Sequence, residues 1–257
     1  MIKFKKLNQN HKFMKKIYHN SGMYITYSIQ SGKSPYVIFL HGLMSDMHGT
    51  KAIAIGKHLS EHGIGYIRFD CRGHGQSEGN FPEFGISDWA DDASLIINEL
   101  TKEPVILVGS SMGGWSMLLN AIRYPKKVHG LIGIAPAPDF TENILNNFND
   151  KEILQLSTKG YVEIPSDYGD SPYIISNKLI NSGKENLLLN SKIKINCPVH
   201  LLHGGQDADV PIETSLKIME QIDSGDVKLT IVKSANHQFS EQKNLKLICN
   251  SINEMIN

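Results

Sequence analysis

The chain has 257 residues and carries 26 lysines and arginines against 26 aspartates and glutamates, so its formal net charge is zero. This balance gives no electrostatic reason to expect nucleic acid or an anionic membrane as a partner, and no apolar run is long enough for stable insertion across a bilayer. The length suits one large α/β domain, residues 1–257, with ample material for a hydrophobic core.

The first 135 residues alternate between strand-like and helix-like apolar patterns. Two short strands are expected within 16–30, around a turn signal at 20–22. The later elements are expected as strand 36–40, helix 50–62, strand 65–70, helix 87–100, strand 105–109, helix 112–124 and strand 128–135. Ser87 is a candidate N-cap for the helix that begins there. The helix at 112–124 is apolar nearly all round, which predicts a place at the centre of the sheet.

The alternation stops at 136–196, a stretch with only short helical patches such as 140–157. It resumes with strand 199–202, helix 213–222, strand 227–233 and a last helix at 245–256. Strongly apolar strands that alternate with helices predict a mostly parallel sheet, here of eight strands, with helices on both faces. We interpret 136–196 as a small cap inserted after the sixth strand.

The strand expected at 105–109 ends in Gly-Ser-Ser-Met-Gly, and a helix follows. This strand–turn–helix context is the one in which G-x-S-x-G marks a nucleophile elbow. Gly109 and Gly113 lie two residues on either side of Ser111, where side chains would collide with the turn. The pattern therefore predicts Ser111 as the nucleophile and leaves Ser110 one residue off centre.

A serine hydroxyl needs a base within hydrogen-bond reach and a carboxylate that orients the base. In open α/β sheets such groups lie in loops at the carboxyl ends of strands. His237, between the last strand and the last helix, is the candidate base, and His203 at another strand end is the runner-up. Asp207 and Asp209 both suit the carboxylate, and spacing alone does not choose between them.

The oxyanion of an acyl-transfer intermediate needs two preorganised N–H donors. One is expected from the backbone of Met112, directly after the nucleophile, at the start of a helix whose dipole adds to the effect. The other is expected from the backbone of Leu43, in the loop that follows strand 36–40. His41 and Gly42 begin that loop, so we expect them to bind substrate.

No segment predicts a cofactor or a metal ion. Residues 73–77, Gly-His-Gly-Gln-Ser, lack the spacing and the lysine of phosphate-binding loops, and we interpret them as a structural turn near the site. Cys71, Cys197 and Cys249 are scattered and odd in number, which argues against a disulfide framework or a metal cluster and favours a reducing cytoplasm. The first 16 residues are basic but resemble neither a signal peptide nor a transit peptide.

The order of Ser111, an acid and His237 along the chain resembles that of the α/β-hydrolase superfamily. Residues 69–77 are similar to that superfamily's loop after the fourth strand. In its acid-bearing loop the acid lies three residues after a glycine. Gly204 precedes Asp207 by three residues, so the resemblance implies that Asp207 is the acid. It also implies an α/β-hydrolase fold and acyl hydrolysis without a cofactor.

A narrower resemblance lies in residues 41–52, 109–115 and 196–204, which are similar to the mitochondrial acyl-protein thioesterases that also hydrolyse acyl glucuronides. This resemblance implies cleavage of carboxylic esters or thioesters. Because the chain shows no transit peptide, we expect a bacterial relative of that family that acts on small acyl esters or thioesters.

Two alternatives stay open. A peptidase or an acyltransferase can use the same fold and nucleophile. An aminopeptidase would need carboxylates in the cap to hold the substrate's ammonium group, and the available ones are Asp139, Glu142, Asp150, Glu152 and Glu163. A non-catalytic ligand receptor is the other alternative, against which the complete set of nucleophile, acid and base argues. The acyl-chain length, the leaving group and the oligomeric state are not predicted.

Overall fold

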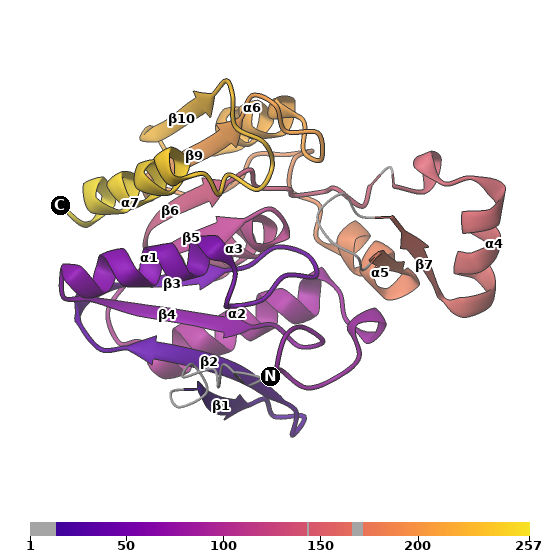
Figure 1. The fold of residues 1–257 in the computed structure, drawn as a ribbon, viewed down its shortest axis with the longest axis horizontal. Coiled ribbons are helices and arrows are strands. Elements are labelled where there is room, and N and C mark those ends of the chain that lie inside the picture. The colour runs from indigo at the N-terminus through magenta and orange to yellow at the C-terminus, as the bar shows by residue number, and fades with distance from the viewer. Residues whose placement is uncertain (1–13, 143, 166–171) are drawn as a thin grey trace, which may run out of the picture.

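The computed structural model describes residues 14–142, 144–165 and 172–257. Its centre is a sheet built from β1 (Met14–Tyr18), β2 (Tyr24–Gln30), β3 (Lys33–Leu40), β4 (Ile64–Asp70), β5 (Val105–Ser110), β6 (Val128–Ile134), β9 (Val199–Gly204) and β10 (Val227–Val232). Within the described chain this sheet has eight strands, in the order β1-β2-β4-β3-β5-β6-β9-β10 (Figure 1). The pairs β1–β2 and β2–β4 are antiparallel and the others are parallel, which confirms the expected arrangement.

Helices cover both faces of the sheet, as a parallel sheet requires. They are α1 (Thr50–Glu61), α2 (Ile86–Leu100), α3 (Met112–Arg123), α6 (Ile212–Gln221) and α7 (Gln242–Ile256). Successive side chains of a strand point to opposite faces, so β3 contributes Val37 and Phe39 to one buried cluster and Ile38 and Leu40 to another. Helices α1 and α7 pack on the first cluster, and α2, α3 and α6 pack on the second.

The segment between β6 and β9 forms a cap that projects from one end of the sheet (Figure 1). It contains η3 (Ile144–Asn147), α4 (Asp150–Lys159), the antiparallel pair β7 (Tyr161–Ile164) and β8 (Tyr173–Ser176), and α5 (Asn177–Glu185). The carbonyl of Asn186 accepts a hydrogen bond of 2.9 Å from Trp115 Nε1 of α3. The amide of Asn186 donates to Ser87 Oγ of α2 at 2.8 Å. These contacts fasten the α5 end of the cap to the body of the protein.

The expected N-cap role of Ser87 is wrong. Helix α2 begins at Ile86 after Gly85, whose backbone N–H donates to the carboxylate of Asp88 at 3.0 Å. The Ser87 hydroxyl is instead held by Ser182 at 3.0 Å and by the cap amide described above. The Ser87 hydroxyl therefore makes tertiary hydrogen bonds to the cap, in place of the N-cap hydrogen bond that the local sequence predicts.

No helix in the described ranges is long and apolar enough to cross a membrane. Residues 1–13, which hold most of the basic N-terminal segment, lie outside the described residues.

Candidate active site

Ser111 lies in the tight turn between β5 and α3. Its backbone has φ 53° and ψ −120°, a strained conformation that costs about 1–3 kcal/mol and is typical of functional turns. The Ser111 N–H donates to the carbonyl of Ile134 at 3.0 Å. The Ser111 carbonyl accepts from the N–H groups of Gly114 at 2.8 Å and Ala137 at 3.0 Å. The surrounding backbone therefore holds the strained residue in place.

The glycines around Ser111 leave no room for side chains. A Cβ on Gly109 would lie 2.6 Å from the carbonyl oxygen of Gly113. A Cβ on Gly113 would strike the carbonyl oxygen of Leu40 in β3. These contacts confirm the predicted reason for the G-x-S-x-G pattern.

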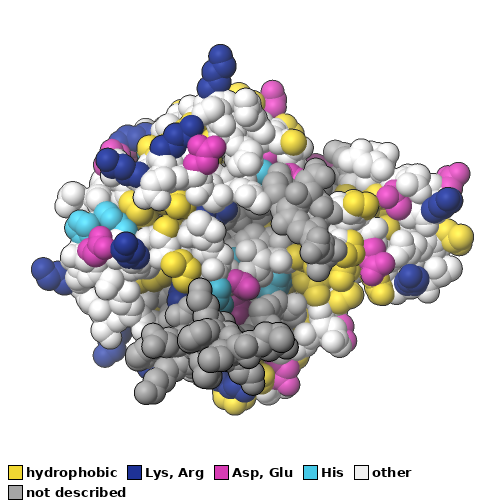
Figure 2. Space-filling model, viewed as in Figure 1, with side chains coloured by type: hydrophobic (Ala, Val, Ile, Leu, Met, Phe, Trp, Pro, Cys, Tyr) yellow, Lys and Arg dark blue, Asp and Glu magenta, His cyan; other side chains and the backbone are white. Residues whose placement is uncertain are grey.

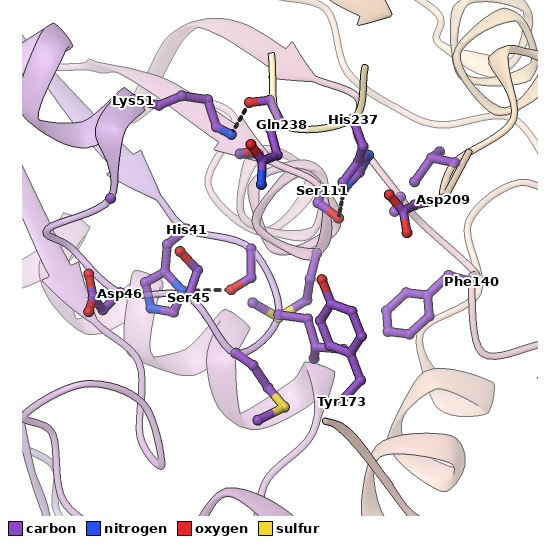
Figure 3. A pocket seen from close by; sticks show the side chains of 18 of the residues that line it. His41, Ser45, Asp46, Lys51, Ser111, Phe140, Tyr173, Asp209, His237 and Gln238 are labelled. Carbon is purple, nitrogen blue, oxygen red and sulfur yellow. Dashed lines mark hydrogen bonds between the residues drawn. The ribbon is translucent and has the colours of Figure 1, made fainter. Parts of the chain in front are cut away.

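His237 connects Ser111 to Asp207, although the three residues come from separate loops. His237 Nε2 lies 3.2 Å from Ser111 Oγ (Figure 3), and His237 Nδ1 lies 2.8 Å from Asp207 Oδ2. The Asp207 side chain is 1% exposed and the His237 side chain is 14% exposed. The structure thus brings together the nucleophile, base and acid that the sequence predicts.

The environment of Asp207 sets the tautomer of His237. Burial alone would raise the pKa of Asp207, but hydrogen bonds from His237, Val210 and Asp209 outweigh it and lower that pKa. The two backbone N–H groups bind Oδ1, at 3.0 Å from Asp209 and 2.9 Å from Val210. An ionised Oδ2 therefore faces Nδ1 of His237, which places the ring proton on Nδ1 and leaves Nε2 to accept a proton from Ser111.

The loop that carries His237 is held from two sides. Phe239 has φ 51°, and its side chain is fully buried in the core on the α1 face. Lys51 of α1 donates from Nζ to the carbonyl of Gln238 at 2.6 Å (Figure 3), and burial lowers the pKa of Lys51 to about 8. The contact of Lys51 could not be predicted, because no local pattern separates Lys51 from Lys57, the exposed lysine of the same helix.

The alternative acid and base lie close by but in other positions. Asp209 has an exposed side chain that lines the cavity in front of the nucleophile. His203 is fully buried, with Nδ1 2.7 Å from Ser215 Oγ and Nε2 2.9 Å from the carbonyl of Val210. The same Nε2 lies 3.5 Å from Asp207 Oδ2. His203 therefore lies behind the carboxylate rather than between it and the nucleophile.

The loop after β3 passes beside the nucleophile. A Cβ on Gly42 would lie 3.5 Å from the Cβ of Ser111, so the two backbones are close. Leu43 and Met112 line the cavity. Met112 is the first residue of α3, so its N–H has no helical acceptor. The Leu43 N–H has no hydrogen-bond partner within the described part of the chain. Both predicted donors are therefore available for an oxyanion.

His41 lines the cavity but is only 1% exposed. Its Nδ1 lies 2.8 Å from the carbonyl of Gly42, and its Nε2 accepts from the N–H of Cys71 at 3.1 Å. Because backbone groups use both ring nitrogens, His41 offers the cavity no free hydrogen-bonding atom. Substrate binding by His41 and Gly42 stays a prediction.

A cavity of about 590 Å³ opens in front of Ser111. Its cap side is apolar and includes Phe140, Ile144, Ile164 and Ile175. The opposite side, from the loop after β3 and the start of α1, is mixed: it includes the polar Ser45, Asp46, Thr50 and Lys51 beside the apolar Leu43, Met44 and Ala52. Hydrophobic side chains gather on the surface where the cap meets the body (Figure 2). The cavity therefore has a largely apolar cap side and an opposite side that adds polar side chains.

Three of the site residues could also ligate a metal ion. Asp207, Asp209 and His237 offer ligand atoms that all lie within 4.8 Å of one another. Two of these residues already bond to each other through Asp207 Oδ2 and His237 Nδ1, so a metal ion would compete with that bond. The expectation of no metal stays a prediction.

Known protein families and sequences include relatives that match most of this chain. The family model described as "Serine aminopeptidase, S33" matches residues 33–178. Palmitoyl-protein thioesterase ABHD10, a mitochondrial protein of Bos taurus and Homo sapiens, is 38% identical over 233 residues. These residues are 90% of this chain and 76% of each relative.

Two solved structures have the same architecture. A putative hydrolase from Agrobacterium vitis has a TM-score of 0.89 at 35% identity, and alpha/beta hydrolase domain-containing protein 10 from mouse has a TM-score of 0.87 at 34% identity. Each comparison covers 95% of this chain and 98% of the other. The similarity therefore extends over nearly the whole chain.

Proposed function

The chain belongs to the serine aminopeptidase S33 family of α/β-hydrolases, and we propose that it is a serine hydrolase that cleaves carboxylic esters and thioesters through an acyl-enzyme on Ser111. The observation that carries this proposal is the continuous hydrogen-bonded line from Asp207 through His237 to Ser111, at 2.8 and 3.2 Å. The thioesterase activity named for the relatives at 38% identity supports an acyl substrate.

Acylation follows from the positions of the atoms. His237 Nε2 accepts the hydroxyl proton as Ser111 Oγ attacks the acyl carbonyl, and Asp207 stabilises the imidazolium that forms. The N–H groups of Leu43 and Met112 bind the oxyanion, and the positive end of the α3 dipole lies beside them. The imidazolium then gives its proton to the alcohol or thiol, which leaves as the carbonyl re-forms.

Deacylation repeats these steps with water as the nucleophile. His237 takes a proton from water, the resulting hydroxide attacks the acyl carbon, and the same two N–H groups bind the oxyanion. The proton then returns to Ser111 Oγ, and the carboxylic acid leaves. The proposed cycle uses no cofactor.

The different lining of the two sides of the cavity suggests how a substrate lies in it. We place the acyl chain against the apolar cap residues and the leaving group against the polar side chains of the loop after β3, Ser45 and Asp46. The volume of about 590 Å³ lies within the range of small-molecule sites, about 300–1,000 Å³. A small acyl ester or thioester is therefore the proposed substrate class.

The aminopeptidase alternative finds less support. None of the five cap carboxylates considered from the sequence lines the described part of the cavity. Asp139 is buried and accepts from the backbone N–H groups of Leu188 and Leu189 at 2.7–3.1 Å. A substrate ammonium would depend on Asp46 or Asp209, the acidic residues that do line the described cavity.

We also propose a reducing compartment, the cytoplasm, for this protein. The three cysteines are free thiols, and burial raises the pKa of each of them. Raised pKa values keep the thiols protonated and poorly reactive. Subcellular fractionation of the source cells tests this placement, which recovery in an oxidising compartment would contradict.

The function is tested with p-nitrophenyl acetate, butyrate, octanoate and dodecanoate, a matched series of acyl thioesters, and alanine p-nitroanilide. Ser111→Ala is the control variant. We expect turnover of esters and thioesters, no turnover by Ser111→Ala, and covalent labelling of wild type alone by a fluorophosphonate probe. Faster turnover of the anilide would favour a peptidase, and the absence of both turnover and labelling would favour a ligand receptor.

A further inference from the structure

The Gly-His-Gly-Gln-Ser segment at 73–77 has no part in the proposed steps, yet it lies against the loop that follows β3. The backbone N–H of Met44 donates to His74 Nε2 at 3.2 Å. Three residues further along that loop, the N–H of Met47 donates to Asp70 Oδ1 at 2.7 Å. Side-chain acceptors from β4 and its following loop therefore hold the backbone that carries one predicted oxyanion donor.

The loop that is held in this way contains a strained turn. The N–H of Ser45 donates to the carbonyl of Gly42 at 3.2 Å, which closes a β-turn whose third residue, Met44, has φ 52°. An L residue adopts this left-handed conformation only at a cost in free energy, so contacts outside the turn must stabilise it. The geometry of this turn sets the direction of the Leu43 N–H.

His74 is well placed to supply that stabilisation. Its ring is 4% exposed and packs edge-on against Trp89, with 5.1 Å between ring centroids. Its Nδ1 lies 3.2 Å from the carbonyl of Arg72, so Nδ1 carries the proton and Nε2 accepts from Met44. Burial and the neighbouring His41 keep the pKa of His74 well below its ordinary value, so Nε2 stays an acceptor at neutral pH.

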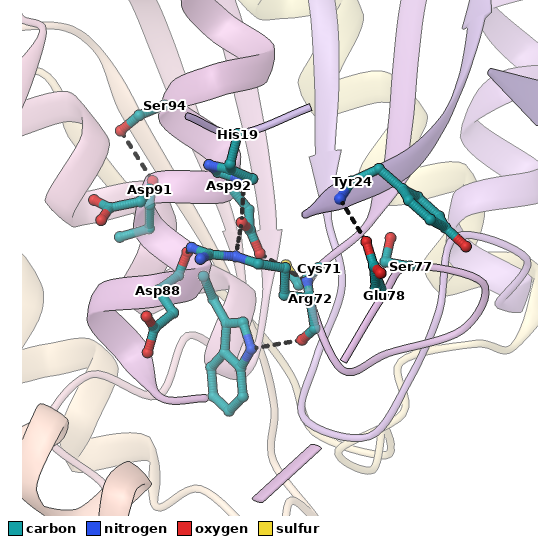
Figure 4. Close-up of polar contacts among 12 residues, drawn as sticks. His19, Tyr24, Cys71, Arg72, Ser77, Glu78, Asp88, Asp91, Asp92 and Ser94 are labelled. Atoms are coloured by element: carbon teal, nitrogen blue, oxygen red, sulfur yellow. Dashed lines mark hydrogen bonds and ion pairs between the residues drawn. The ribbon is translucent and has the colours of Figure 1, made fainter. Parts of the chain in front are cut away.

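The backbone that leads into His74 is itself fixed through Arg72, which Figure 4 shows bound to Asp92. Asp92 of α2 is fully buried and accepts from Nε of Arg72 at 2.6 Å and from its backbone N–H at 2.7 Å. The Arg72 carbonyl also accepts from Trp89 Nε1 at 3.1 Å. A Cβ on Gly75 would strike the carboxylate of Asp70, so the loop can close only around glycine. The backbone on both sides of His74 is therefore held in place.

We propose that His74 is a positioning residue for the oxyanion hole, which acts through the N–H of Met44 to hold the Leu43 N–H toward the acyl carbonyl at Ser111. The inference rests on the proposed function, because the held donor matters only if an oxyanion forms there. His74 touches no reacting atom, and its effect on turnover is indirect.

Two substitutions separate the acceptor from the packing of the ring. His74→Gln places an amide oxygen near the position of Nε2, whereas His74→Asn keeps a donor for Arg72 but no acceptor for Met44. With p-nitrophenyl acetate we expect His74→Asn to lower kcat about 10- to 100-fold at nearly unchanged KM, since loss of a whole oxyanion donor costs about 100- to 1,000-fold. His74→Gln should stay within about threefold of wild type.

A boronic acid inhibitor gives a second readout, because its tetrahedral adduct with Ser111 places an oxygen in the oxyanion hole. Its inhibition constant should rise in His74→Asn by about the factor that kcat falls. Equal losses in the Gln and Asn variants, or a loss seen in KM alone, would overturn the positioning role.

A backbone variant keeps the inference testable if His74→Asn does not fold. Replacing Met44 with its α-hydroxy acid, by nonsense suppression, removes the N–H donor and keeps every side chain. We expect the same loss in kcat, and an unchanged kcat would overturn the inference. A wild-type protein without hydrolysis or fluorophosphonate labelling would refute the proposed function itself, whereas an active wild type with an equally active His74→Asn would refute the positioning role alone.

Discussion

Asp207→Asn should abolish nearly all turnover while the fold stays intact. Asp207 Oδ1 accepts the N–H groups of Asp209 and Val210, so the asparagine oxygen should keep that position. The NH2 group then replaces Oδ2, 2.8 Å from His237 Nδ1. Because NH2 cannot accept a hydrogen bond, the ring proton moves to Nε2 and faces Ser111. With its proton on Nε2, His237 cannot accept the Ser111 hydroxyl proton. The wrong tautomer should therefore lower kcat about 10⁴-fold, which corresponds to a loss of about 5 kcal/mol of transition-state stabilisation.

The assay is hydrolysis of p-nitrophenyl butyrate near neutral pH, with kcat and KM measured separately and a thermal melt for each variant. Asp209→Asn is the matched control, since Asp209 lies in the same loop and has an exposed side chain. We expect its kcat to fall less than about tenfold, because its carboxylate does not set the tautomer. A loss below about 100-fold in Asp207→Asn, or a larger loss in Asp209→Asn, would refute the reasoning.

Three further predictions concern residues around the hydrogen-bonded line from Asp207 through His237 to Ser111. Burial lowers the pKa of Lys51 to about 8 in the folded protein, from an ordinary 10.5. Between pH 8 and pH 10.5 Lys51 therefore binds a proton more often in the unfolded chain than in the folded one, so the wild-type protein becomes more stable as the pH rises. The Lys51→Met variant has no titrating group at this position and should not show this gain. In urea denaturation, its free energy of unfolding should therefore drop relative to that of wild type by about 2–3 kcal/mol between about pH 7 and pH 10. A difference that stays constant with pH would contradict this prediction. Phe140→Ala should lower kcat/KM about tenfold for the octanoyl ester and much less for the acetyl ester, because it removes apolar surface from the cap side of the cavity. Equal losses for the two esters would show that the acyl chain does not bind on the cap side. Gly109→Ala should destabilise the fold by about 4 kcal/mol, which a thermal melt would show as a melting temperature lower by about 10 °C. Gly225→Ala is the control: nothing lies within 4 Å of its new Cβ, so its melting temperature should change little.

The parts of the molecule that sequence predicts well are those with a local and buried pattern. Every residue of β5 is buried, and the following turn has no room at Gly109 and Gly113, so the apolar run and the glycine spacing point directly to Ser111, the proposed nucleophile. The choice of Asp207 over Asp209 is different. The two backbone N–H groups that orient Asp207 come from its own loop, but the histidine that it faces is 30 residues away. Only the resemblance to a known family could make that choice.

Long-range contacts and short strands account for most of what was missed. The hydrogen bond from Lys51 to Gln238 spans 187 residues and leaves no trace in either local sequence. The strands β7 and β8 have four residues each, too few for an alternating pattern to be distinguished from a loop. The Ser87 hydroxyl, expected at a helix end, is taken by the cap 95 and 99 residues away.

The main chain supplies the strained turn at Ser111 and both proposed oxyanion donors, which limits how such a catalyst can diversify. No codon change at Leu43 or Met112 deletes their N–H groups, short of proline, and any larger residue at Gly109 or Gly113 collides with backbone. New substrate preferences must therefore arise where side chains, not backbone, form the wall. A directed-evolution library for this scaffold should randomise Phe140 and its apolar neighbours in the cap and leave the elbow untouched.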